Sequence, residues 1–264
     1  MERLAEVTPH IYRLVIPFED IYTTVFIVKT PSAAILFDTA TYPGDVDAYI
    51  LPALEALGIT EQMLKFIVLS HSHRDHAGGL RRLTENYPAV CVVSRNPELP
   101  ESYEGVTFRF PEDGAQLTPE ITVCAVPGHS RDSLALLDNR TETLLTGDSL
   151  QLYGIYGSGQ WGSNITLPVE HLKAVEKLRM LAVKRIVASH DYHPCGHLAE
   201  GAAVEQYLDA CAEALYKIKA AVLENPEQED MVDLAENYNA DSGLPVVSPR
   251  VFNAMRDAID AGEI

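Results

Sequence analysis

His71-Ser72-His73-Arg74-Asp75-His76 is the stretch of this sequence from which both the fold and the site follow. It brings four side chains that bind metals into six residues. His71 and His73 alternate, so on an extended segment their side chains would share one face. Neutral imidazole and carboxylate are the ligands that zinc prefers in catalytic sites. The spacing, which follows directly on the apolar run Lys65–Ser70, therefore predicts a metal site instead of a polar surface loop.

Three more metal-binding residues follow along the chain, and each comes directly after a predicted strand. Taken alone, each of the three would more often be a capping or turn residue than a ligand. Taken together with the first motif, they complete two metal sites, which would use five of the nine histidines. They are His129 after Ile121–Val126, Asp148 after Thr143–Thr146 and His190 after Arg185–Ser189.

An internal echo links the first motif to the last ligand. Lys65–His71 and Lys184–His190 share the pattern K-x-I-V-x-S-H. Each copy is preceded by a strand that ends in an aspartate, Asp38 or Asp148, and then by a helical stretch. Both copies are therefore predicted to be strand–helix–strand units with a histidine at the carboxyl end of the second strand. Two such units predict an α/β architecture with the polar groups gathered at one sheet edge.

The remaining elements are short strands and amphipathic helices, with no low-complexity tract or Gly/Ser linker between them. The other predicted strands are His10–Ile16, Tyr22–Lys29, Ala33–Phe37, Ala89–Ser94 and Leu134–Leu137, and the predicted helices are Asp45–Leu57, Ala77–Asn86, Pro168–Leu181, Ala199–Leu223, Glu227–Asn237 and Pro249–Asp260.

The charge of the chain indicates which kinds of substrate or partner it can bind. The formal net charge is −18, and the segment Leu198–Ile264 holds 14 Asp and Glu against 4 Lys and Arg. Such a surface repels phosphate backbones, which argues against nucleic acid as a substrate or partner. A small-molecule substrate fits this balance better. Acidity also keeps proteins soluble, and that role alone accounts for most of the charge.

Two further features bear on the compartment. No run approaches the roughly 18–20 apolar residues of a membrane span, and the first six residues carry charges where a signal peptide is apolar. The four cysteines show no paired spacing, which is typical of a reducing compartment. We therefore expect a cytoplasmic protein that does not associate with membranes.

The order of these ligands, H-x-H-x-D-H followed by a lone His, Asp and His, resembles that of the metallo-β-lactamase superfamily over roughly residues 1–200. The resemblance implies an αβ/βα sandwich, in which two β-sheets pack together with helices outside. We expect residues 1–200 to form this catalytic domain and residues 201–264 to be a helical extension packed on it. By the same resemblance, Asp38 orients a ligand histidine. It also implies two divalent metal ions, held by His71, His73 and His129 at the first site and by Asp75, His76 and His190 at the second, with Asp148 bridging them.

Departures from particular branches of the superfamily narrow the activity. True β-lactamases lack the bridging aspartate, so Asp148 argues against that reaction. Flavodiiron proteins carry a glutamate where His73 stands, and nucleases usually have a basic surface. What remains resembles the glyoxalase II and lactonase branches. The fit is incomplete, because Gln151 stands where the lactonases have a tyrosine and the acidic C-terminal part lacks the basic residues of glyoxalase II.

The resemblance thus implies a hydrolase of a small ester, thioester or lactone, which uses a hydroxide that bridges two metal ions. Zinc is the expected metal, with iron and manganese as alternatives. Asp75 could accept a proton from the water, and Tyr153 or Tyr156 could donate to the developing oxyanion; plain packing is the alternative for either tyrosine. Two other activities stay open, a mononuclear iron sulfur dioxygenase of the same fold and a metal-binding module without catalysis.

The 21 residues from Ser149 to Val169 contain no charged side chain. They follow directly on Asp148 and include Tyr153, Tyr156 and Trp161. This composition predicts an aromatic wall beside the metals. A buried connection and a contact in a homodimer are the alternatives, and the sequence leaves them open.

Overall fold

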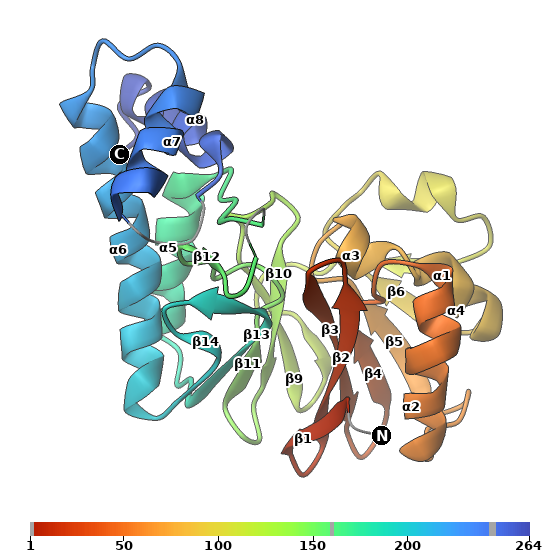
Figure 1. Cartoon of the computed structure of the whole chain (residues 1–264). Helices are drawn as coiled ribbons and strands as arrows, with labels where there is room; N and C mark the ends of the chain where they lie inside the picture. The colour runs from red at the N-terminus through yellow and green to blue at the C-terminus, as the bar shows by residue number, and fades with distance from the viewer. Residues whose placement is uncertain (1–2, 159–160, 243–246) are drawn as a thin grey trace. The chain divides into compact units, whose positions relative to one another are not determined.

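The computed structural model describes residues 3–158, 161–242 and 247–264, in two compact units. Unit 1 comprises residues 1–125 and 134–141, and unit 2 comprises residues 126–133 and 142–264. The architecture is the predicted one, two mixed β-sheets flanked by helices, with further helices at the C-terminal end (Figure 1). Among the described residues, no helix combines the length and the apolar character that crossing a membrane requires.

The first sheet lies in unit 1, and its seven strands follow one another in chain order. The first four pair antiparallel and the last four pair parallel, so β4 belongs to both parts. All four residues of β4 are buried, as expected of a strand covered on both faces. The strands are β1 (Leu4–Thr8), β2 (Ile11–Phe18), β3 (Ile21–Lys29), β4 (Ala34–Phe37), β5 (Leu64–Val68), β6 (Cys91–Val93) and β7 (Thr107–Arg109).

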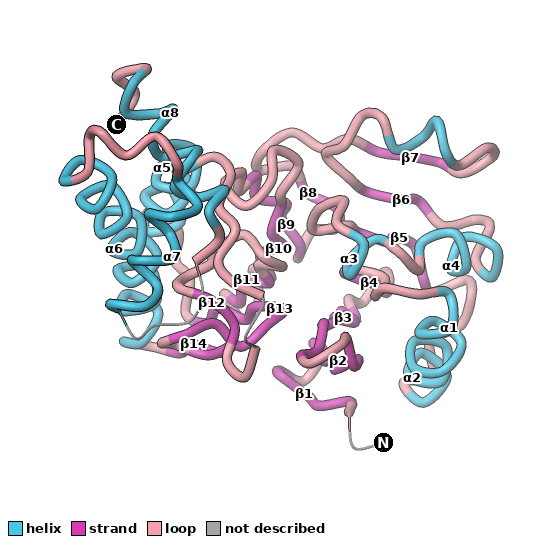
Figure 2. The backbone as a smooth tube through the Cα atoms, turned by 45° about the horizontal axis from the view of Figure 1, so that its top comes forward, coloured by secondary structure: helices cyan, strands magenta, loops and turns pink. Residues whose placement is uncertain are grey.

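The predicted helix Asp45–Leu57 is present but irregular. It consists of α1 (Pro43–Asp45), the π-helical turn η1 (Val46–Ile50) and α2 (Leu51–Ala56). Pro52 has no N–H group to donate to a carbonyl four residues back, and the amide of Leu51 donates to Val46 O, five residues back. The helices lie on one face of the sheet (Figures 1 and 2), where their apolar residues join its core.

The predicted helix Ala77–Asn86 is wrong in one respect. It is divided into α3 (Arg74–Ala77) and α4 (Leu80–Asn86), with Gly78 and Gly79 between them. The metal-binding motif therefore enters the helical part of the chain earlier than predicted, and Asp75 and His76 lie in the first turn of α3.

The remaining strands belong to the second sheet. In unit 1, β9 pairs antiparallel with both β8 and β10. In unit 2, β13 pairs parallel with β11 and antiparallel with β12 and β14. The strands are β8 (Gln116–Thr118), β9 (Ile121–Ala125), β10 (Leu134–Asp138), β11 (Thr143–Leu145), β12 (Gly154–Ile155), β13 (Arg185–His193) and β14 (Gly196–Glu200).

The internal echo corresponds to two parallel strand pairs. Leu36 on β4 is opposite Ile67 on β5, and Leu144 on β11 is opposite Ile186 on β13. Each pair closes with an equivalent hydrogen bond, from Asp38 N to Val68 O at 2.8 Å and from Thr146 N to Val187 O at 3.1 Å. One detail of the prediction is wrong, because β13 does not end before His190 but continues to His193.

The helices of unit 2 agree with the predicted segments to within a few residues. They are α5 (Pro168–Arg179), α6 (Ala202–Glu224), α7 (Met231–Ser242) and α8 (Pro249–Asp260). Helix α6 packs against α5, α8 and β14, and its apolar face joins α7 and α8 in one buried cluster (Figure 2). The division into a catalytic domain and a helical extension at residue 200 stays a prediction.

Asp138 ties the end of β10 to the N-terminal strands of unit 1. Its carboxylate is 1% exposed and lies 2.8 Å from His10 Nε2 and 3.1 Å from the donating amide of Thr141. Burial alone would raise its pKa, but hydrogen bonds from Thr141 and His10 and the nearby charges of His10 and Arg140 lower the pKa of Asp138 below its usual value.

We expect Asp138→Asn to lower the free energy of unfolding at pH 7 by about 1–3 kcal/mol, because hydrogen bonds to a buried charge are lost. A lowered carboxyl pKa stabilises the fold above the unfolded-state pKa of about 3.9, and this stabilisation is lost as the pH falls through the folded-state pKa. Urea unfolding at pH 7 and pH 3 checks this, with exposed Asp260→Asn as the control. A difference between variant and parent that stays constant with pH would contradict the assignment.

Candidate metal centre

The motif His71–His76 forms a compact cluster of imidazoles in unit 1. His71 and His76 are buried and His73 is exposed. The ring centroid of His71 lies 4.6 Å from that of His73 and 4.3 Å from that of His76. The potential ligand atoms of His71 and His73 lie within 4.8 Å of one another, and so do those of Asp75 and His76. The structure therefore brings the four residues of the motif together as the sequence predicts.

Two glycines allow this cluster to pack on the loop that follows β4. A Cβ atom on Gly78 would lie 2.0 Å from Thr41 O, and one on Gly79 would lie 2.1 Å from Thr39 O. Any side chain would therefore collide with backbone that has no room to move. The close approach lets Thr39 donate to His76 O from both its amide, at 2.7 Å, and its hydroxyl, at 2.8 Å.

Asp38 fixes the orientation of His76, as predicted. Its side chain is fully buried, with one oxygen 2.7 Å from His76 Nδ1 and the other accepting from Ser70 N at 2.7 Å. Burial raises the pKa of Asp38, while His76 and the Ser70 amide act in the opposite direction. With Nδ1 held in this way, His76 turns Nε2 toward Asp75 Oδ2, at 3.2 Å. Asp38 also has a φ of 70°, a left-handed conformation in which non-glycine residues are uncommon.

Asp148 lies between two histidines in unit 2. Its Oδ2 is 3.8 Å from His129 Nε2, and its Oδ1 is 3.4 Å from His190 Nε2. Ligand atoms about 2.0–2.2 Å from one tetrahedral ion are separated by roughly 3.3–3.6 Å, close to both distances. Each carboxylate oxygen is thus paired with a different imidazole, which is the arrangement that a bridging carboxylate requires.

A segment before α5 holds His129 in place. Asn164 O accepts from His129 Nδ1 at 2.7 Å, and the hydroxyl of Thr166 donates to His129 O at 2.9 Å. Gly128 O accepts from the amides of Thr166 and Leu167, both at 2.9 Å. The segment 164–167 therefore clasps residues 128–129, a role that the sequence analysis did not predict.

The sequence analysis also gave no role to His171, which packs directly against this clasp. A Cβ atom on Gly128 would lie 2.8 Å from His171 Cβ, so only glycine fits there. His171 is fully buried, and burial first, then the charge of His129, lower its pKa to about 4. The Pro127-Gly128 pair before His129 was the available signal for this close packing.

The donor set in each unit fits a divalent metal ion. It consists of imidazole nitrogens and carboxylate oxygens, the ligands of catalytic zinc sites. In three of the histidines the Nδ1 atom is engaged by a protein group: Ser70 Oγ for His71, Asp38 for His76 and Asn164 O for His129. Such contacts fix the tautomer and leave Nε2 as the ligand atom.

The two predicted tyrosines lie in different surroundings. Tyr153 is buried, and the ammonium group of Lys217 on α6 lies 5.3 Å from its ring centroid. Tyr156 is 47% exposed, donates to Pro194 O at 3.3 Å and has its ring 4.8 Å from that of His193. A catalytic role for either stays a prediction. Gly159 and Gln160, in the uncharged stretch that includes both tyrosines, lie outside the described residues.

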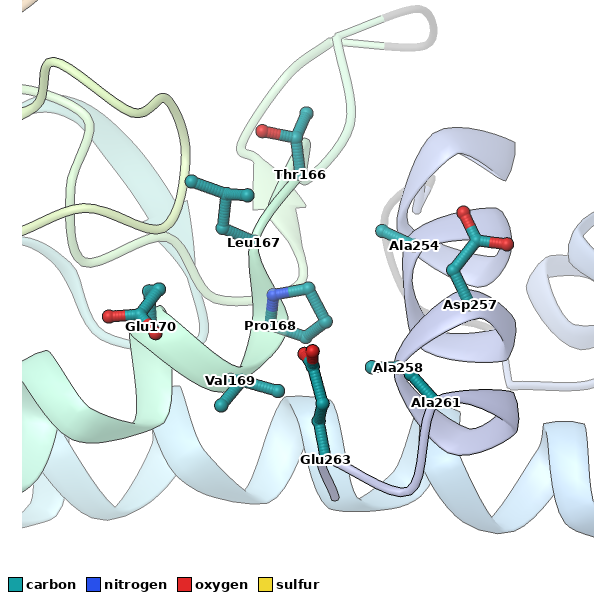
Figure 3. Close-up of a pocket in the computed structure, with 10 residues that line it drawn as sticks. All are labelled: Thr166, Leu167, Pro168, Val169, Glu170, Ala254, Asp257, Ala258, Ala261 and Glu263. Atoms are coloured by element: carbon teal, nitrogen blue, oxygen red, sulfur yellow. The ribbon is translucent and has the colours of Figure 1, made fainter.

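A cavity of about 350 Å³ lies between the start of α5 and the end of α8 (Figure 3). Pro168 and the small side chains of Ala254, Ala258 and Ala261 line it, and the carboxylate of Glu263 lies between Pro168 and Ala258. None of the predicted metal ligands lines this cavity.

The sequence model of the metallo-beta-lactamase superfamily matches residues 19–190, which include the whole set of predicted ligands. The chain belongs to this superfamily. Within it, the chain is 24% identical over 178 residues to a beta-lactamase-like protein 2 homolog of Caenorhabditis elegans, a match that covers 66% of this chain and 57% of that protein. It is 28% identical over 132 residues to thioesterase pkgB of Emericella nidulans, covering 50% and 37%.

The chain thus spans little more than half the length of the first of these superfamily relatives and less than half of the second. Among solved structures, the metallo-beta-lactamase FIM-1 from Pseudomonas aeruginosa, in its mono-zinc form, has a TM-score of 0.60 at 18% identity. That match covers 81% of this chain and 94% of the other, and it establishes a common fold.

We expect Asp38→Ala to reduce zinc affinity by about 10–100-fold, because groups that only orient a ligand typically contribute that much. Competition with a chromophoric chelator measures the affinity. Asp45→Ala is the matched control, since Asp45 Oδ2 also accepts from backbone amides nearby, those of Thr41 and Tyr42, but no contact with a predicted ligand is recorded for it. Equal zinc affinity in the two variants would show that Asp38 does not orient His76 toward a metal.

Proposed function

We propose that the chain is a dinuclear metal-dependent hydrolase. The superfamily to which it belongs includes metal-dependent hydrolases, and the order of the ligands along the chain supports the assignment. The observation that carries it is Asp148, whose two oxygens lie beside different histidines. We assign His71, His73 and His129 to the first ion, Asp75, His76 and His190 to the second, and Asp148 to both.

Two divalent cations, when bound, lower the pKa of a shared water so that hydroxide is supplied near neutral pH. The residues of the chain provide the rest. Asp38 holds His76 in one tautomer, and the Asn164 carbonyl does the same for His129. Asp75, whose side chain is 18% exposed, would be the proton acceptor for that water when the metals are bound. Tyr156, the more exposed of the two tyrosines, is the better placed to meet a substrate oxygen, and Tyr153 is the alternative.

We propose a small ester, thioester or lactone as the substrate, in keeping with the glyoxalase II and lactonase branches. A relative that is named a thioesterase supports this class. Zinc is the proposed metal, with iron or manganese as alternatives, and residues 1–200 are the proposed catalytic part. The net charge of −18 supports a small molecule over nucleic acid. The proposals of a cytoplasmic location and of a homodimer rest on the sequence alone.

We expect Asp148→Asn to lower metal occupancy and to reduce hydrolysis by more than the roughly 100-fold upper value for a group that only orients a ligand. The substitution keeps the shape of the side chain but removes the charge shared by two cations. Metal analysis of the parent protein should find two equivalents of a divalent ion. The control variant is Asp138→Asn, which also removes the charge of a buried aspartate but not of a predicted ligand. Full metal content and turnover in Asp148→Asn would end the dinuclear assignment, and one equivalent of iron in the parent would favour the dioxygenase.

We also expect neutral esters or lactones to be hydrolysed faster than multiply charged thioesters such as those of glutathione. A strongly negative surface slows the approach of anions, and salt screens this effect over about 10 Å at 0.1 M. The measurement is kcat/KM for matched neutral and anionic substrates at low and high ionic strength, where the gap should narrow as salt rises. A strong preference for the anionic substrate at low salt would point to a local basic pocket.

A further inference from the structure

Gln151 connects two parts of unit 2 that contact predicted metal ligands. It lies three residues after Asp148 and is 3% exposed. Its Oε1 accepts from Asn164 N at 2.6 Å, and its Nε2 donates to the hydroxyl of Tyr192 at 3.3 Å. One buried amide side chain therefore uses both of its polar ends on partners that lie far apart in the sequence.

The first end of Gln151 leads to His129. Asn164 donates its amide to Gln151, and its own carbonyl accepts from His129 Nδ1 at 2.7 Å. Gln151 thereby fixes the peptide unit that presents this carbonyl. A shift of Asn164 would turn the imidazole of His129, because the bond to Nδ1 is what sets the orientation of the ring.

The second end leads to His190. Tyr192 is fully buried, and its ring packs edge-on against His190 at 5.9 Å and 76°. The phenol accepts a hydrogen bond from Gln151 Nε2, so Gln151 is joined through Tyr192 to the ring of His190.

Packing alone does not account for a glutamine here. Leu150 and Leu152, which flank it in the sequence, and Ile165, which follows its partner Asn164, are buried apolar residues, and a methionine is similar in size to a glutamine. Burying an amide costs free energy unless its polar atoms are bonded, and such a group specifies structure only when its partners are in place. The value of Gln151 therefore lies in the groups that it holds.

We propose that Gln151 and Tyr192 are positioning residues, which together hold His129 and His190 in the geometry that binds the metal ions. The proposal rests on the metal site of the proposed function. Gln151 stands at the position where the lactonases have a tyrosine. The proposal gives this residue a role in holding the metal ligands and not in contacting the substrate.

The test uses two isosteric variants of the full chain, Gln151→Met and Tyr192→Phe, with Tyr207→Phe as the matched control. Tyr207 is also fully buried and also uses its hydroxyl in the core, where it donates to Leu150 O at 3.3 Å, with no recorded hydrogen bond to a predicted ligand. Zinc affinity is measured by chelator competition, and thermal unfolding of the metal-free proteins reports folding. We expect each test variant to lose about 10–100-fold in zinc affinity and the control to lose less than threefold.

Two further readouts separate positioning from plain stability. The visible absorption of the cobalt-substituted protein reports ligand geometry, and at saturating cobalt it should change in both test variants but not in Tyr207→Phe. Because the two residues share one hydrogen bond, the loss of affinity in the double variant should be smaller than the sum of the losses in the two single variants. Additive losses, or unchanged affinity and spectra, would overturn the proposal.

The outcomes also separate this inference from the proposed function. Suppose that the variants lose zinc binding but the parent protein hydrolyses no ester, thioester or lactone. That result would support the positioning role of Gln151 and Tyr192 and would contradict the proposed hydrolase function. Hydrolysis with unchanged zinc affinity in both variants would do the reverse. A parent protein that binds no zinc, cobalt, iron or manganese would overturn both.

Discussion

Burying imidazoles and carboxylates is the constraint on which the rest of this structure depends. His71, His76, His129 and His190 are each at most 4% exposed, and Asp148 is 7% exposed. A buried polar group is costly unless it is hydrogen-bonded, and a charge is more costly still. An imidazole that keeps Nε2 for a metal must therefore satisfy Nδ1 within the protein. Ser70, Asp38 and Asn164 do this for His71, His76 and His129.

Meeting that requirement determines the backbone around the site. Asp38 and Ala40 have positive φ values of 70° and 62°, which cost free energy in residues other than glycine. The fully buried β4 before them and the parallel β5 beside it hold this loop in place. Gly78 and Gly79 lie on the other side of this contact, where the absence of side chains lets α3 and α4 approach the same loop. The strain lies where the ligand partners are held, and the buried strands compensate for it.

The parts predicted from the sequence are those in which the signal is local. The metal-binding motif, the strand before it and the K-x-I-V-x-S-H echo are contiguous patterns, and the structure confirms the strand pairs. The predictions were wrong or incomplete where tertiary contacts determine the bounds of an element. β13 continues through polar residues to His193 because β12 and β14 pair with it, and the apolar pattern stops at Ser189. β7 (Thr107–Arg109) has only three residues, which is too short for its alternation to stand out in the sequence.

The uncharged stretch Ser149–Val169 shows why composition alone gave an incomplete account. Its aromatic residues predicted a wall, but Gln151 near its start and Asn164–Leu167 near its end hold His129. Both ends are therefore constrained by hydrogen bonds that lead to His129, a predicted metal ligand, whereas Tyr156 and Trp161 between them are exposed at 47% and 36%. A loop that is fixed at both ends by buried hydrogen bonds tolerates change in its middle without moving what its ends hold. Selection on the substrate would then act on exposed residues such as Tyr156 and Trp161 while the geometry of His129 stays constant. The departure at Gln151 belongs to the constrained end, so it bears on how metals are held before it bears on what is hydrolysed.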